Sequence, residues 1–126
     1  MELKPTVGAP GGNIISTYPL AKGGYTVESG TSMATPFVAG SAALVLQTRG
    51  KSSVKGIRDL FQSTASPIRS GTEETDLLQT LAVAGAGLVQ VNVAVDAKTL
   101  VTPGQLLLND TAHFNSVYVG QLFVHY

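Results

Sequence analysis

Residues 29–40 read SGTSMATPFVAG. Within this stretch Ser32 stands between a glycine turn and a long run of apolar residues, which is typical of a buried helix. We predict a helix from about Ser32 to Thr48, with Gly50 as its C-terminal stop. Pro36 would break a helix interior, but in a first turn the N–H groups have no intrahelical partner. We therefore expect the helix to begin at or just before Ser32.

The start of this helix suits a nucleophile. A helix N-terminus presents free N–H groups and a partial positive charge. The backbone N–H of Ser32 could therefore stabilise an oxyanion on an attacked carbonyl group. Gly30 lets the chain turn and leaves room for a substrate backbone. The simpler interpretation is that Ser32 is only a helix cap, because serine is among the commonest residues in that role.

Residues 30–40 resemble the nucleophile signature of the subtilases, the subtilisin-like serine proteases. That signature reads Gly-Thr-Ser-Met-Ala-x-Pro-x-Val-Ala-Gly, and this chain fills every fixed position. The length of the match favours a nucleophile over a plain cap. The resemblance implies that Ser32 is the nucleophile and also an oxyanion N–H donor. It assigns supporting places to Gly30, Thr31, Met33 and Pro36.

The flanking sequence also resembles the family. Matching blocks stand at residues 3–5, 9–11, 15–17 and 85–89, so the resemblance covers residues 3–97. It makes residues 91–97 helical, whereas the alternating valines from Val89 to Val95 by periodicity alone favour a strand. We follow the resemblance here.

Three places depart from the family pattern. Thr6 stands where an acidic residue is common, and Gln90 replaces the usual Asn or Asp before the late helix. Residues 116–126 match nothing in the family. These departures leave the predicted fold unchanged.

The fold that the resemblance implies is α/β. It has three layers, with a mostly parallel sheet and the nucleophile helix buried among them. We expect residues 1–98 to form the C-terminal part of that catalytic domain, and residues 99–126 to begin a β-rich region that is cut short. On its own the helix at 32–48 would expose an apolar face, which predicts low solubility or association with other chains.

Local patterns predict the remaining elements. Strands are expected at 14–18 and 25–29, and a short one at 106–108. A helix is expected at 53–64, with a serine cap.

The family resemblance also implies what this chain lacks. Subtilases place the catalytic aspartate, the histidine and an oxyanion-hole asparagine before the serine, so all three would precede residue 1. A serine hydroxyl without a base is a poor nucleophile. In subtilisin itself, loss of the histidine lowers turnover roughly a million-fold. We therefore expect a serine endopeptidase by resemblance, but an inactive isolated chain.

Two alternatives stay open. An α/β-hydrolase elbow, Gly-x-Ser-x-Gly, is approximated by residues 30–34 with the last glycine replaced. The chain order permits such a triad, although the elbow does not require residues 35–40. Its members would be drawn from Ser32, then Asp76, Asp96 or Asp110, then His113 or His125. The other alternative is a non-catalytic fragment or pseudoenzyme.

Composition narrows the possible partners. The charges of eight basic and eight acidic residues cancel, which argues against binding to nucleic acid or to anionic membranes. There is no cysteine, and the two histidines are too far apart in sequence for a metal site, so no cofactor or metal is expected. The expected partners are a polypeptide substrate and the missing N-terminal part of the catalytic domain.

Localisation is predicted from the resemblance alone. Residues 1–5 have neither the basic start nor the apolar run of a secretory signal. Because most proteases of this family are secreted, the resemblance nevertheless predicts an extracellular protein. The glycosylation sequon at Asn109 would matter only on that route.

Overall fold

A computed structural model describes residues 3–105 and 123–125 of the chain. Two helices dominate it, α1 (Thr31–Arg49) and α2 (Val54–Thr64). The shorter helical elements are η1 (Leu20–Lys22), α3 (Leu81–Ala84) and α4 (Val91–Asp96), and the strands are β1 (Ile14–Thr17), β2 (Tyr25–Glu28), β3 (Leu100–Thr102) and β4 (Phe123–His125). The mixture of helices and strands confirms the α/β class.

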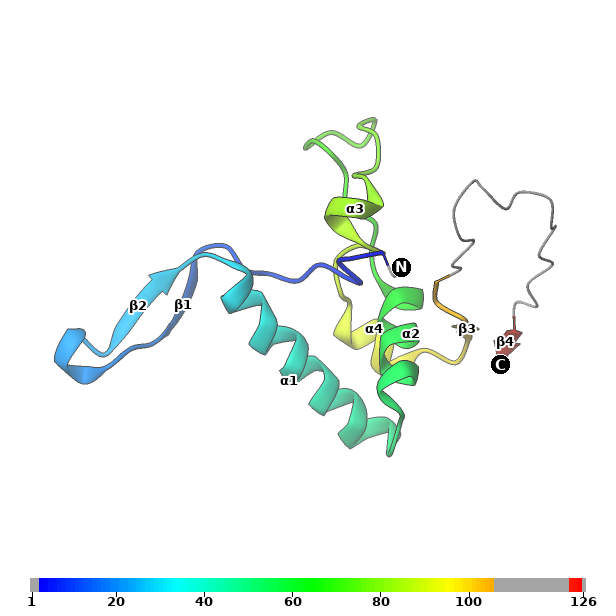
Figure 1. Cartoon of the computed structure of the whole chain (residues 1–126), viewed down its shortest axis with the longest axis horizontal. Helices are drawn as coiled ribbons and strands as arrows, with labels where there is room; N and C mark the ends of the chain where they lie inside the picture. The colour runs from blue at the N-terminus through cyan, green and yellow to red at the C-terminus, as the bar shows by residue number, and fades with distance from the viewer. Residues whose placement is uncertain (1–2, 106–122, 126) are drawn as a thin grey trace.

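The core lies where α1, α2 and α4 meet (Figure 1). Val45 of α1 packs there with Leu60 and Phe61 of α2 and with Ala94 of α4. Helix α2 is amphipathic, and Ser53 caps it by accepting a hydrogen bond from the Gly56 N–H at 3.0 Å. This core fixes the axis of α1, and so fixes where its N-terminus lies.

The family resemblance predicted a helix at residues 91–97 and the valine periodicity favoured a strand. The structure has the helix, α4. Ala94 is fully buried in the core, while Val93 is 45% exposed. The alternation of valines had favoured a strand, in which residues two apart share a face. The backbone is instead helical from Val91 to Asp96, and only one face of it meets α1 and α2.

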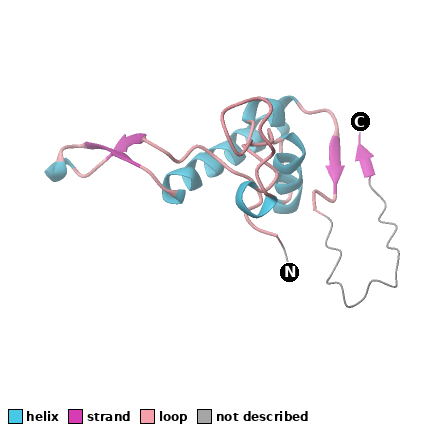
Figure 2. Ribbon diagram, turned by 90° about the horizontal axis from the view of Figure 1, so that it is seen from above, coloured by secondary structure: helices cyan, strands magenta, loops and turns pink. Residues whose placement is uncertain are grey.

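The strands form two short antiparallel pairs. In the β1–β2 ribbon Ile14 pairs with Glu28 and Thr17 with Tyr25, and in the second pair β3 lies beside β4. The ribbon extends away from the helices at one end of the molecule, while β3 and β4 lie at the other (Figure 2). Both ribbon strands and α2 fall within one residue of their predicted bounds.

The mostly parallel sheet of the family fold is not formed among the described residues. Its one trace there is a parallel bridge between Gly8 and Leu88. A parallel sheet joins strands through helical crossovers and is covered on both faces. The described residues bring only this single pair of extended segments together in parallel, so no such sheet can form from them alone.

Helix α1 is correspondingly less buried than the family resemblance implies. Only Ser41 and Val45 are buried, while Phe37, Leu44 and Leu46 are 42%, 51% and 41% exposed. The buried setting of this helix is thus not reproduced by the described residues. The exposed apolar face that we expected of the chain on its own is present.

Several predictions fall outside the described residues. They include the strand at 106–108, the sequon at Asn109, and His113. Of the 116–126 segment only β4 is described, and its backbone pairs with β3. Within the part of the chain that the structure covers, no helix has both the length and the hydropathy needed to cross a bilayer.

Candidate active site at the start of helix α1

The turn between β2 and α1 places Ser32 at the start of the long helix. Gly30 is the N-cap residue, and its carbonyl oxygen accepts hydrogen bonds from the N–H groups of Met33 at 3.0 Å and Ala34 at 3.3 Å. Thr31 is the first helical residue and Ser32 the second. The predicted helix start is therefore confirmed.

Ser32 is not the cap of this helix. The cap position belongs to Gly30, and no side chain makes a capping hydrogen bond there. The Ser32 residue is exposed. Within the described residues neither its hydroxyl nor its backbone N–H has a hydrogen-bond partner. Both groups are thus available to a molecule that approaches the helix end.

A loop on the N-terminal side of β1 braces this turn. The Gly30 N–H donates to the Gly11 carbonyl oxygen at 2.7 Å. The Asn13 N–H donates to Ser29 Oγ at 2.8 Å. A Cβ atom on Gly11 would lie 2.7 Å from the Gly30 oxygen, which is closer than real Cβ atoms come, and 3.1 Å from the Ala34 Cβ, which is a tight contact. Gly11 is therefore glycine because the turn packs directly against it.

Sequence reasoning missed Gly11 and Ser29 as supports of the site. The block at residues 9–11 was matched to the family as a loop, without a role. The sequence feature that could have pointed to this support is the pair Pro10-Gly11, which precedes the nucleophile turn. Such a signal marks a loop but does not say what the loop contacts.

Pro36 lies further into the helix than the sequence predicted, because it was expected in the first turn. Pro36 is the sixth residue of α1, so it lies beyond the first turn rather than within it. A helical residue there would donate its N–H to the carbonyl of Ser32, four residues earlier, and proline has no such N–H. In the neighbouring position Thr35 Oγ1 donates to the Thr31 oxygen at 2.8 Å. Pro36 therefore releases the Ser32 carbonyl from the helix ladder.

The residues that the structure describes do not bring a base to Ser32. His113 lies outside the described residues, and only the backbone of His125, in β4, is described. Asp96 ends α4, whose last carbonyls accept from the Arg49 guanidinium at the far end of α1. Seventeen residues of helix separate that end from Ser32, which is about 25 Å. Asp96 is therefore not placed to assist Ser32.

The other acidic candidates offer no site either. Asp76 closes its own loop, because its Oδ2 atom accepts from the Glu73 N–H at 2.8 Å. Asp110 lies outside the described residues. Across residues 3–105 and 123–125, no group of three His, Asp or Glu side chains is arranged to hold a metal ion.

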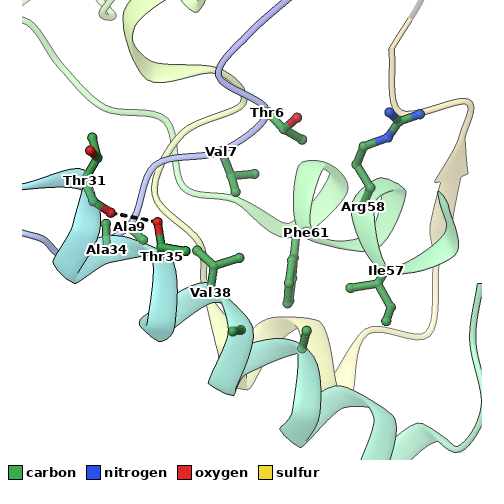
Figure 3. A pocket seen from close by; sticks show the side chains of 12 residues that line it. Thr6, Val7, Ala9, Thr31, Ala34, Thr35, Val38, Ile57, Arg58 and Phe61 are labelled. Carbon is green, nitrogen blue, oxygen red and sulfur yellow. Dashed lines mark hydrogen bonds between the residues drawn. The ribbon is translucent and has the colours of Figure 1, made fainter. Parts of the chain in front are cut away.

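An open hollow begins beside the nucleophile turn. It lies between α1, α2 and the segment of residues 6–9, and its volume is about 580 Å³. The lining is mainly apolar and includes Val7, Ala9, Val38, Ala42 and Phe61 (Figure 3). Thr31, next to Ser32 in the chain, forms one end of the hollow. A sizeable apolar surface is therefore continuous with the candidate site.

Comparison with known proteins identifies the family. The model of the subtilase family matches residues 1–105. The minor extracellular protease Vpr of Bacillus subtilis is 36% identical over 106 residues, which are 81% of this chain and 13% of that protein. A PII-type proteinase of Lactococcus lactis is 37% identical over 112 residues, 77% of this chain and 6% of that protein.

A shorter relative shows the same pattern. Subtilisin BL of Lederbergia lenta is 43% identical over 86 residues, 68% of this chain and 28% of that protein. The chain thus spans less than a third of the length of each of these relatives. The match covers the turn, the long helix and the loop that braces them, and this chain belongs to the subtilase family.

Proposed function

We propose that Ser32 is the nucleophile of a serine endopeptidase that cleaves polypeptides through an acyl-enzyme. The Ser32 hydroxyl oxygen attacks the peptide carbonyl carbon, and a base takes its proton. The Ser32 N–H donates to the oxyanion that forms. The C–N bond then breaks, the proton passes to the leaving amine, and water hydrolyses the ester.

The observation that carries this proposal is that Ser32 lies at the N-terminus of α1 with its hydroxyl and its N–H unoccupied among the described residues. Its hydroxyl is exposed, and its N–H has no partner among the described residues. Gly30 and Thr31 set the turn, Met33 anchors it through its N–H, and Pro36 frees the Ser32 carbonyl. The base must come from outside the described residues, so the chain alone is expected to be inactive.

The names of the relatives support a place where the enzyme acts. One relative is named as an extracellular protease, which supports an extracellular site of action for this protein as well. Residues 1–98 would be the C-terminal part of the catalytic domain, and residues 99–126 the start of a further region.

A chimera with Subtilisin BL tests the proposal. The stretch of that protein that matches this chain is replaced by the matching stretch from here, which includes Ser32. We expect a fluorophosphonate probe to label the chimera and Ser32→Ala to abolish both labelling and peptide cleavage. Loss of the nucleophile lowers subtilisin turnover roughly a million-fold. Ser52→Ala, an exposed position beyond the far end of α1, leaves Ser32 and the turn around it intact and should still be labelled.

The alternative function is a non-catalytic one. It is favoured because neither Asp76 nor Asp96 is placed to assist Ser32 and no histidine side chain lies among the described residues. A chimera that folds, as judged by a cooperative urea transition, and yet takes up no probe would support it. The same result would count against Ser32 as a nucleophile.

A further inference from the structure

The part of the chain that carries Ser32 holds very little charge. Between Lys22 and Arg49 the one side chain with a full charge is that of Glu28. It lies four residues before Ser32 in the sequence. A molecule that approaches the nucleophile along this stretch therefore meets a single carboxylate, and the stretch has no basic group that would balance it.

The backbone holds Glu28 in place. Glu28 is the last residue of β2, and it pairs with Ile14 of β1. The turn that follows is fixed as well, because Ser29 Oγ accepts from the Asn13 N–H at 2.8 Å. Figure 1 shows that β2 leads directly into the start of α1. The position of Glu28 relative to Ser32 is therefore set by the same hydrogen bonds that brace the nucleophile turn.

The charge of Glu28 is not used within the described part of the chain. Its side chain is exposed, and its carboxylate has neither a hydrogen-bond partner nor an ion-pair partner among the described residues. Lys22, the basic residue of the ribbon, lies over the ring of Tyr18, with 5.6 Å between Nζ and the ring centroid. Glu28 therefore does not stabilise the ribbon through an ion pair, and its carboxylate is free to act on a ligand.

The distance between Glu28 and Ser32 suits contact with a substrate. A chain extends by at most about 3.6 Å per residue, so the Cα atoms of these two residues lie within about 14 Å of each other. An extended substrate covers that distance in about four residues. Attraction between charges persists over a screening length of about 8 Å at physiological salt. The carboxylate is therefore near enough to act on a charged side chain close to the scissile bond.

We propose that Glu28 is a specificity-determining residue that favours substrates with a lysine or an arginine close to the scissile bond. An unpaired carboxylate attracts a cationic side chain and repels an acidic one. The inference rests on the proposed function, because it describes the substrate of the site around Ser32. It names a substrate class, which the motif at residues 29–40 leaves open.

Peptide cleavage by the chimera with Subtilisin BL tests the preference. The chimera is built so that it carries both Glu28 and Ser32 of this chain. Its substrates are peptide pairs that differ by a lysine or a glutamine at one position, which is moved along about four residues on either side of the scissile bond. At one or more positions we expect kcat/KM to be about two- to fivefold higher for the lysine peptide, the range of an exposed ion pair. In about 1 M salt, where the screening length is about 3 Å, this advantage should disappear.

Variants of Glu28 assign the preference to its charge. Glu28→Gln keeps the shape of the side chain, so the lysine and glutamine peptides should become equally good substrates. Glu28→Lys should make the lysine peptide the poorer of the two. Glu74→Gln is the matched control, because Glu74 is an exposed acid in the loop at residues 73–76, and it should keep the original ratio. A merely structural effect of Glu28 would change the rates of both peptides alike and leave their ratio unmoved.

One result would overturn the proposal. It is a ratio of lysine to glutamine peptides that Glu28→Gln leaves unchanged at every position. That result is expected where the rest of the catalytic domain supplies a basic partner for Glu28, since the carboxylate would then be neutralised before a substrate arrives.

Binding to an inactive variant separates this inference from the nucleophile assignment. In the Ser32→Ala chimera, calorimetric titration measures the affinity for the same peptides without cleavage. A lysine peptide that binds more tightly than its glutamine partner, and loses this advantage when Glu28→Gln is added, supports the charge preference even if the unchanged chimera takes up no fluorophosphonate. Labelling of Ser32 together with no effect of Glu28 on either cleavage or binding would leave the nucleophile standing and remove the substrate class.

Discussion

At the level of single residues, the candidate site depends as much on its bracing loop as on Ser32. Two hydrogen bonds, from Gly30 to Gly11 and from Asn13 to Ser29, hold the turn against that loop. Neither bond involves the nucleophile itself. Such contacts position a catalytic group, and a small displacement of that group is enough to lower a rate.

Gly11→Ala tests this brace. The added methyl group would clash with the Gly30 carbonyl oxygen, so the turn must shift. We expect the free energy of unfolding to fall by about 1–3 kcal/mol, the usual cost of overpacking. Urea denaturation of the chimera measures it. Gly12→Ala is the matched control, because nothing lies within 4 Å of a Cβ at that position. Equal stability of the two variants would contradict the brace.

The cap of α2 gives a second residue-scale prediction. Ser53 Oγ accepts from the Gly56 N–H at 3.0 Å, whereas Ser52 makes no bond to an α2 N–H among the described residues. Ser53→Ala should lower the free energy of unfolding by about 1 kcal/mol, the typical value for a lost N-cap. Ser52→Ala should leave it nearly unchanged. A reversed order in urea denaturation would place the cap at Ser52.

At the level of elements, helix α4 shows what the sequence pattern could and could not supply. Its valines alternate, and nothing local distinguishes a strand from a helix over so few residues. What decides the outcome is tertiary. Ala94 fits into the core against Val45, and Arg49 binds the carbonyl groups at the end of α4. Neither contact can be predicted from the valine spacing, and only the family resemblance anticipated the helix.

Arg49→Met tests this tertiary support. Arg49 Nη1 lies 3.2, 3.1 and 2.6 Å from the carbonyl oxygens of Ala94, Val95 and Ala97. Methionine keeps the aliphatic stem but loses these bonds, so we expect about 1–2 kcal/mol less stability and faster amide exchange in α4. Lys51→Met removes a nearby exposed charge and is the control. If α4 exchanges no faster in the Arg49 variant, the clamp is not what holds the helix.

At the level of the whole molecule, the start of the long helix could be predicted because its determinants are local, whereas the α/β class was predicted through the family resemblance. They reside in the motif at residues 29–40 and in the caps. The mostly parallel sheet could not be predicted from local sequence. Its parallel strands depend on partners far away in sequence, and the described residues provide only the Gly8–Leu88 bridge. The same absence of partners explains why α1 keeps an exposed apolar face.

That exposed face predicts the behaviour of the isolated chain in solution. Phe37 and Leu44 lie on one side of α1 and Leu46 on nearly the opposite side, and they are 42%, 51% and 41% exposed. Apolar surface left in water in this way drives association. Light scattering should give an apparent mass that rises with concentration. Replacing all three residues by serine should lower that mass toward the monomer. Leu77→Ser, a loop position that is 82% exposed, should not. A mass that stays at the monomer value for the unchanged chain would mean that this face is tolerated in water, and would remove the main physical reason to expect a covering partner.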